Sequence, residues 1–317
     1  MSTITPIPEL VGITSHTEYD NGLLRECSLN ERNVIHTSVG DLVPHFSSPD
    51  ERSKDLKSIS YYESGAIRSI SLDKQTEVST PIGEFPAELV TFYEDGTMDS
   101  VFPLNGQIGF TWSEKDEERL AESYSFEFSF DTITAKTIGV RFFHSGAVKS
   151  LIWWPDEIVQ LDTPTGKYPA RTGIRLFEDG RLRSFEPAVP IIMKTPVGIV
   201  QAFDVEAVTI DADENSVRFD HEGHLAHLAT AGDVIIAGPT IGRKRISSLT
   251  RMALGEDKPV KLSISIDFGP DTVTFDNGEE KASFSISENR FLVMPDISTD
   301  GLSACDLGCD SCDLGCA

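Results

Sequence analysis

YESGAIRS, at residues 62–69, is the clearest instance of a short phrase that runs aromatic, polar, polar, Gly, any residue, apolar, polar, Ser. The same phrase returns as YEDGTMDS at 93–100, FHSGAVKS at 143–150 and FEDGRLRS at 177–184. The glycine tolerates the positive φ of a tight turn, and the residues around it alternate between apolar and polar. Each copy therefore predicts a β-hairpin.

A second phrase, Thr-Pro-x-Gly, alternates with the first at residues 80–83, 163–166 and 195–198. Proline presets φ for a turn, and the glycine can take a positive value. Weaker copies of the first phrase lie at residues 19–26 and around Gly223. The spacing of the strong copies predicts an internal duplication, because Gly146 follows Gly65 by 81 residues.

We therefore predict an all-β protein in which repeated β-hairpins form an extended sheet or solenoid, since one hairpin cannot bury its own apolar face. The predicted segments are an N-terminal segment (1–55), the duplicated hairpin repeat region (56–232), a β-rich C-terminal cap (233–296) and a cysteine-rich tail (297–317). One short helix is expected at residues 113–122, with Ser113 as its N-cap. At the pair Trp153 and Trp154, strict strand alternation would put one ring inside and leave the other exposed to a sugar or protein contact, but packing at an edge or in the core is the more common arrangement.

The doubled aromatic before the turn, in YYESGAIRS and FYEDGTMDS, resembles the MORN-variant repeat of bacterial antitoxin-like proteins. The resemblance covers the hairpin phrases between about residues 56 and 230. It implies a stacked-hairpin sheet that acts as a binding or scaffolding module. It implies no catalytic residues.

The charge balance restricts the partners. The chain has 27 Lys and Arg against 51 Asp and Glu, for a formal net charge of −24. Such an excess of acid repels phosphate backbones and anionic bilayers, so we do not expect nucleic acid or a membrane as a partner. We expect a protein partner. The first ten residues do not read as a secretory signal, and we expect a cytoplasmic protein.

Four of the five cysteines crowd into the tail: Cys305, Cys309, Cys312 and Cys316. They come from the pentapeptide CDLGC written twice, which gives the spacing C-x3-C-x2-C-x3-C. Four thiolates on a short loop could ligate Zn²⁺ or an iron–sulfur cluster. The aspartates between them disfavour a free thiolate, so metal ligation is favoured over thiol catalysis. Redox exchange and a role as a flexible appendage remain alternatives.

His221, His224 and His227 form a second candidate metal motif, H-x2-H-x2-H. Strand residues three apart face opposite sides of a sheet, so polar decoration of an exposed hairpin is the preferred interpretation.

The sequence thus favours a non-enzymatic, cytoplasmic binding or scaffold protein with a broad acidic surface and a metal-ligating tail. One alternative is a metal or sulfur trafficking or maturation factor for a partner enzyme. Another is an enzyme whose site lies in a cleft between sheet and cap.

Overall fold

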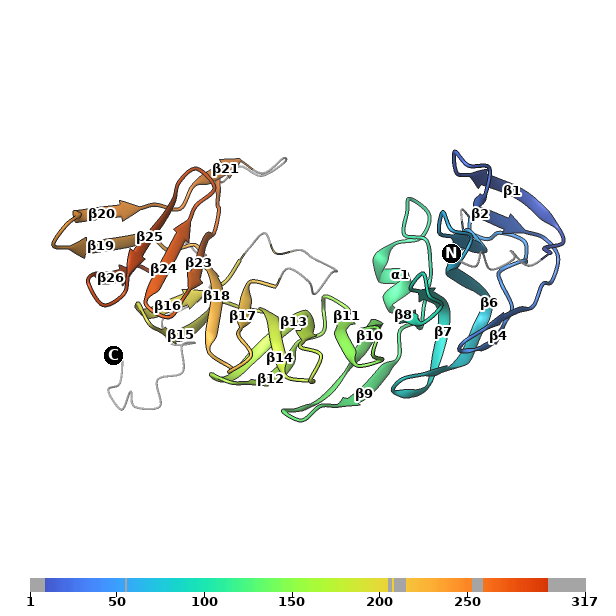
Figure 1. Cartoon of the computed structure of the whole chain (residues 1–317), viewed down its shortest axis with the longest axis horizontal. Coiled ribbons are helices and arrows are strands. Elements are labelled where there is room, and N and C mark those ends of the chain that lie inside the picture. Colours follow the sequence, from blue (N-terminus) through green and yellow to red (C-terminus); the bar gives the residue numbers. More distant parts are fainter. Residues whose placement is uncertain (1–8, 55, 205–206, 208–214, 253–258, 296–317) are drawn as a thin grey trace, which may run out of the picture. The chain divides into compact units, whose positions relative to one another are not determined.

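The computed structural model describes residues 9–54, 56–204, 207, 215–252 and 259–295. The chain is all-β as predicted, and α1 (Glu114–Glu118) is the one α-helix within those ranges (Figure 1). It divides into two compact units, residues 1–189 with 207–227 and residues 190–206 with 228–317. The division of the sequence into segments 1–55, 56–232, 233–296 and 297–317 remains a prediction.

The first unit contains most of the strands. They are β1 (Ile13–Glu18), β2 (Leu24–Leu29), β3 (Ile35–Thr37), β4 (Gly40–Leu42), β5 (Ile59–Tyr61), β6 (Ile67–Thr80), β7 (Gly83–Phe92), β8 (Met98–Phe102), β9 (Ser123–Glu127), β10 (Thr132–Phe142), β11 (Val148–Trp153), β12 (Val159–Thr163), β13 (Gly166–Leu176), β14 (Leu182–Pro187), β17 (Val217–Phe219) and the start of β18 (Leu225–Thr230).

Each copy of the first phrase is a hairpin turn with one hydrogen-bond pattern. The N–H of Tyr62 donates to the carbonyl of Ala66 at 2.8 Å, and the N–H of Gly65 donates to the carbonyl of Tyr62 at 2.9 Å. The same two bonds recur in the turns that end at Gly22, Gly96, Gly146, Gly180 and Gly223. All six glycines have φ between +78° and +86°, so the predicted need for glycine is confirmed.

The hairpins join edge to edge into one antiparallel array. The strand order is β1, β2, β5, β6, β7, β8, β10, β11, β13, β14, β17 and β18. Directly opposed residues form a straight polar row across the array: Glu26, Ser60, Ser69, Thr91, Ser100, Arg141, Ser150, Arg175, Ser184, Arg218 and His227. Since the row is straight, all six turns lie at one edge of the sheet, here called the turn edge.

A second row, one residue along each strand, faces the opposite side and is apolar. Its members are fully buried: Cys27, Ile59, Ile70, Val90, Val101, Val140, Leu151, Ile174, Phe185 and Val217. Burying such a side chain contributes about 1.5–3 kcal/mol, so this row is the spine of the core. The final Ser of the repeat phrase is thereby explained, because it is the member of the polar row next to that spine.

The second phrase forms hairpins closed by the threonine side chain. In the β6–β7 turn the hydroxyl of Thr80 donates to the carbonyl of Gly83 at 2.7 Å and accepts from the N–H of Ile82 at 3.2 Å. Thr163 and Thr195 make the equivalent bonds. Residues 37–40, which lack the proline, form a fourth such turn between β3 and β4.

The two kinds of turn pack against each other. A Cβ on Gly146 would lie 3.3 Å from the Cβ of Pro81, and one on Gly223 would lie 3.2 Å from the Cβ of Pro164. In the third instance the hydroxyl of Ser38 donates to the carbonyl of Gly96 at 2.7 Å. Three of the four second-phrase turns thus cover a first-phrase turn about 60 residues later in the chain, which explains why the phrases alternate in the first unit.

Helix α1 is anchored by a buried charge cluster. The helix has the predicted N-cap, Ser113, but ends at Glu118 rather than continuing to residue 122, because β9 begins at Ser123. Glu117, whose side chain is 4% exposed, accepts two bonds from Arg52 at 2.6 and 2.7 Å and one from the indole of Trp112 at 2.6 Å. Arg52 also binds Glu88, so the cluster fastens the segment before β5 and the helix to β7.

The tryptophan pair packs in the core, the more common of the two expected arrangements, and neither ring is exposed as strict strand alternation would require. Trp153 is fully buried and Trp154 is 6% exposed. Strand β11 ends at Trp153, so the alternation that would have turned Trp154 outward stops there.

The second unit is also built of short antiparallel strands. They are β15 (Ile191–Thr195), β16 (Gly198–Ala202), β19 (Val234–Gly238), β20 (Gly242–Ile246), β21 (Thr250–Met252), β22 (Pro259–Lys261), β23 (Ile264–Phe268), β24 (Thr272–Asp276), β25 (Lys281–Ser285) and β26 (Arg290–Val293). Met193, Val200, Val234, Ile236 and Phe275 are fully buried in its core.

Substitution of the turn glycines tests the fold. Gly146→Ala is expected to destabilise the first unit by about 2 kcal/mol or more, since a positive φ alone costs an L-residue roughly 1–2 kcal/mol and the methyl also meets Pro81. Gly180→Ala should cost less, because its Cβ would meet nothing within 4 Å. Gly109→Ala, outside the repeats, should be nearly neutral. Urea unfolding followed by tryptophan fluorescence checks this order, since all three tryptophans lie in the first unit. Equal effects at all three glycines would contradict it.

The charge cluster predicts an acid-dependent stability. Burial acts to raise the pKa of Glu117, but the bonds from Arg52, Trp112 and the N–H of Gly106 outweigh it and hold that pKa below its ordinary value. The cluster therefore stabilises the fold fully above about pH 4.3, the unfolded pKa of Glu, and the contribution is lost as the pH falls through the lower folded pKa.

Glu117→Gln should accordingly cost about 3 kcal/mol at pH 7, because it leaves part of a buried ion cluster uncompensated, and less at pH 3. Glu118→Gln, one residue further along the helix, should be within about 0.5 kcal/mol of the parent protein. Urea midpoints at both pH values measure this difference. A Glu117→Gln penalty that does not shrink in acid would mean that the charge is not what stabilises the cluster.

Candidate functional site

The predicted metal ligands Cys305, Cys309, Cys312 and Cys316 lie outside the described residues. Cys27 is the core cysteine and belongs to the buried apolar row. Burial raises the pKa of its thiol to about 11, against the smaller lowering effect of a hydrogen bond with the backbone of Ile59. Cys27 is therefore a packing residue and a poor nucleophile or metal ligand at neutral pH.

The three histidines of the H-x2-H-x2-H motif do not converge. The ring of His221 stacks on that of Phe177, with centroids 3.8 Å apart. His224 interacts with Asp220, and His227, 7% exposed, lies in the polar row opposite Arg218. The motif therefore does not form a three-histidine metal site.

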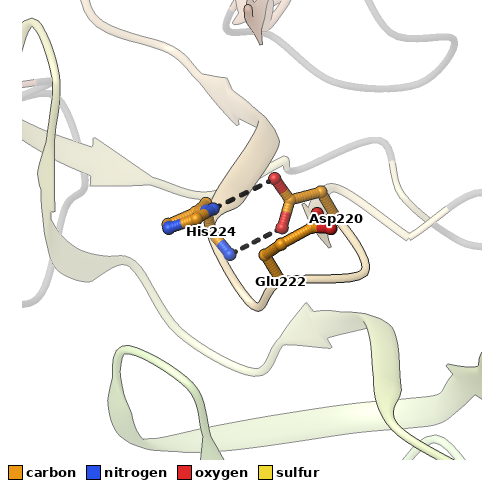
Figure 2. A group of neighbouring side chains, drawn as sticks. All are labelled: Asp220, Glu222 and His224. Atoms are coloured by element: carbon orange, nitrogen blue, oxygen red, sulfur yellow. Dashed lines mark hydrogen bonds and ion pairs between the residues drawn. The ribbon is translucent and has the colours of Figure 1, made fainter. Parts of the chain in front are cut away.

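A different group in the same turn gathers potential metal ligands. Figure 2 shows Asp220, Glu222 and His224 on the hairpin between β17 and β18, with one ligand atom of each within 4.8 Å of the others. The N–H of His224 donates to Asp220 Oδ1 at 2.8 Å, and its Nδ1 lies 3.3 Å from Asp220 Oδ2. Two carboxylates and an imidazole suit a divalent cation. The bonds between His224 and Asp220 alone also explain the arrangement, because they close the turn. Asp220 occupies the position at which the other five turns have an aromatic residue.

The turn edge is strongly acidic. Seven exposed carboxylates lie on five of its six turns: Asp20, Glu63, Glu94, Asp95, Glu178, Asp179 and Glu222. The side chain and N–H of Thr97 hold the pKa of Asp95 below its ordinary value, and Arg181 does the same for Asp179. Asp95 and Asp179 are therefore charged at neutral pH.

Side-chain contacts link four of the five pairs of consecutive turns. The hydroxyl of Tyr19 donates to the carbonyl of Tyr61 at 2.8 Å, that of Tyr62 to Phe92 at 2.9 Å, and that of Tyr93 to Phe142 at 2.7 Å. In later turns, where phenylalanine replaces tyrosine, His221 stacks on the preceding aromatic ring, as His144 does on Tyr93 at 3.7 Å. The carboxylates of the turn edge are thus displayed from a connected backbone.

Positive charge lies behind this edge. The guanidinium groups of Arg25, Arg68 and Arg183 lie 5.6–5.9 Å from the centroids of the turn aromatics Tyr19, Tyr62 and Phe177. Such contacts are each worth about 0.5–1 kcal/mol at exposed sites.

Three hollows open along the turn edge, between first-phrase turns and the hairpins that cover them. The first, of about 490 Å³, has Ile35, Ile67 and Phe92 at its base and Glu94 and Asp95 among its lining residues. The second, about 670 Å³, lies beside β9, and the third, about 320 Å³, lies beside the turn of Asp220. Two repeat positions line all three hollows: the residue two after one turn glycine (Ile67, Val148 and Leu182) and the glycine of the next turn (Gly96, Gly180 and Gly223). The sequence could have indicated this only if the second phrase had been recognised as a cover for the first.

Neither family models, nor curated proteins, nor solved structures provide a match for the chain. Its resemblance to MORN-variant repeats thus stays a proposal. The described residues contain no helix long and apolar enough to cross a bilayer, since α1 has five residues.

Proposed function

We propose that the chain is a cytoplasmic, MORN-variant-like binding or scaffold protein that holds a basic protein partner along its acidic turn edge. The observation that carries the proposal is the repetition of one charged turn along a single sheet edge. Because most consecutive turns are hydrogen-bonded or stacked together, the backbone that carries the carboxylates is held in place before a partner arrives, which reduces the entropy lost on binding.

The charge of the whole chain supports this choice of partner. A formal net charge of −24 attracts cationic proteins and accelerates their encounter at low ionic strength. The turn edge converts that general attraction into a defined surface, since its carboxylates recur with the hairpins.

The second part of the proposal is that Cys305, Cys309, Cys312 and Cys316 ligate Zn²⁺ or an iron–sulfur cluster. The support is the doubled CDLGC sequence, whose four sulfur ligands match the preference of both groups. A bound cation would offset the repulsion between thiolates and the neighbouring aspartates.

A charge-neutralising variant tests the turn edge. Fluorescein-labelled decalysine is the probe, and fluorescence anisotropy measures its affinity at 50 and 300 mM NaCl. The triple variant Glu63→Gln, Glu94→Gln, Glu178→Gln should bind roughly tenfold more weakly at 50 mM salt, at about 0.5 kcal/mol for each exposed charge. The difference should shrink at 300 mM because of screening.

The matched control is Glu51→Gln, Glu279→Gln, Glu288→Gln, which removes three exposed carboxylates elsewhere. It should bind the probe nearly as the parent chain does. If the control weakens binding as much as the edge variant, attraction to net charge alone is responsible and the proposed binding edge is wrong.

The tail is tested by elemental analysis and absorption spectroscopy of protein isolated without oxygen. We expect about one Zn²⁺ or one cluster per chain, and loss of it in Cys309→Ser, Cys312→Ser. Cys27→Ala should keep the metal, because Cys27 is in the core. Metal-free parent protein, or full metal content in the double variant, would remove this part of the proposal.

A further inference from the structure

We infer that the second hollow of the turn edge accepts a lysine or arginine side chain of a protein partner. This inference rests on the proposed scaffold function and adds a specific binding pocket to it. The hollow lies within the first unit, between the β6–β7 hairpin, strand β9 and the turns at Gly146 and Gly180. Its volume of about 670 Å³ is within the range of ligand pockets.

The lining is aromatic. Phe85 from β7 meets Tyr124 and Phe126 of β9, with ring centroids 4.9 and 6.0 Å apart, and Phe128 extends the same wall. Leu176, 1% exposed, closes the base. Aromatic faces bind cations, and the apolar base suits the aliphatic stem of a lysine or arginine.

The rim is acidic. Glu84 and Glu127 are both exposed and both line the hollow, and no lysine or arginine is among its lining residues. A third carboxylate, that of Glu122, lies just outside the lining, where its Oε2 accepts a hydrogen bond from the Tyr124 hydroxyl at 3.5 Å. A lining that combines aromatic rings with two carboxylates is complementary to an ammonium or guanidinium group and unfavourable for an anion.

The third hollow differs from the second in that a cation of the chain itself lines it. Arg181 lines it together with Asp220 and Glu222, binds Asp179 at 2.6 Å, and donates to the carbonyl of His221. The residue that corresponds to Arg181 one repeat earlier, beside the second hollow, is Ala147. Here a cation has to come from a partner.

Two hollow variants test the inference with the labelled decalysine probe at 50 mM NaCl. Tyr124→Ala, Phe128→Ala keeps the net charge and should weaken binding about fivefold, as expected for loss of cation–π contacts worth roughly 1 kcal/mol. Glu84→Gln, Glu127→Gln should weaken it to a similar extent. Tryptophan fluorescence and urea midpoints show whether each variant is folded, and the glutamine pair keeps the test decisive if the aromatic pair is not.

In a third variant, the chain itself provides the cation for the second hollow. Ala147→Arg reproduces the arginine of the third hollow. The new side chain should compete with the probe and weaken its binding more than Ser145→Arg does. Ser145 is exposed on the same turn, so the two variants change the charge equally. Equal weakening by both would overturn the inference.

The outcomes separate this inference from the function on which it rests. If the hollow variants bind decalysine like the parent while the turn-edge triple variant does not, the pocket is wrong and the scaffold stands. If neither set weakens binding, both are wrong. If free spermidine displaces the probe at equal molar concentration, the hollow is a polyamine site and the inference of a protein side chain is overturned.

Discussion

The contact between two kinds of turn organises the first unit. A first-phrase turn needs glycine because its φ is positive, and at Gly146 and Gly223 it also needs the absence of a Cβ because a proline ring lies against it. The proline belongs to a hairpin some 60 residues earlier in the chain. This long-range packing holds each of these two covering hairpins against a turn of the sheet, so the repeat depends on pairs of turns and not on single hairpins.

The same arrangement produces the surface chemistry. Strand alternation sends the aliphatic row into the core and the serine and arginine row to the other face, while the turns receive the acids. The covering hairpins leave hollows beside the turns, and the residues that rim these hollows come from the acidic turns or from the adjacent hairpins. Apolar bases and negative rims are therefore a consequence of the fold, and differences between hollows arise from single residues such as Arg181 and Ala147.

Much of this fold could be predicted from the sequence, because a glycine turn flanked by alternating residues is a local signal. The positive φ at the turn glycines, the all-β class and the N-cap at Ser113 follow from such signals. The copy at residues 19–26 is a weaker signal, since Glu26 takes the place of the final Ser. The turn of residues 37–40 is not apparent from the sequence, because its threonine and glycine occur without the proline of the second phrase. Non-local features left no such signal. The bonds of Arg52 to Glu88 and Glu117, the burial of both tryptophans, and the convergence of Glu84 and Glu127 on one hollow depend on which hairpin covers which turn.

The tyrosine bonds have a consequence for how such an array can grow. Each hydroxyl reaches only the backbone of the following hairpin, and a backbone carbonyl is present whatever residue occupies that position. A duplicated hairpin would therefore find the same acceptor in its neighbour, so this link places no limit on the number of hairpins in the array. The covering contacts do, because they join turns about 60 residues apart and a new hairpin has to preserve that pairing.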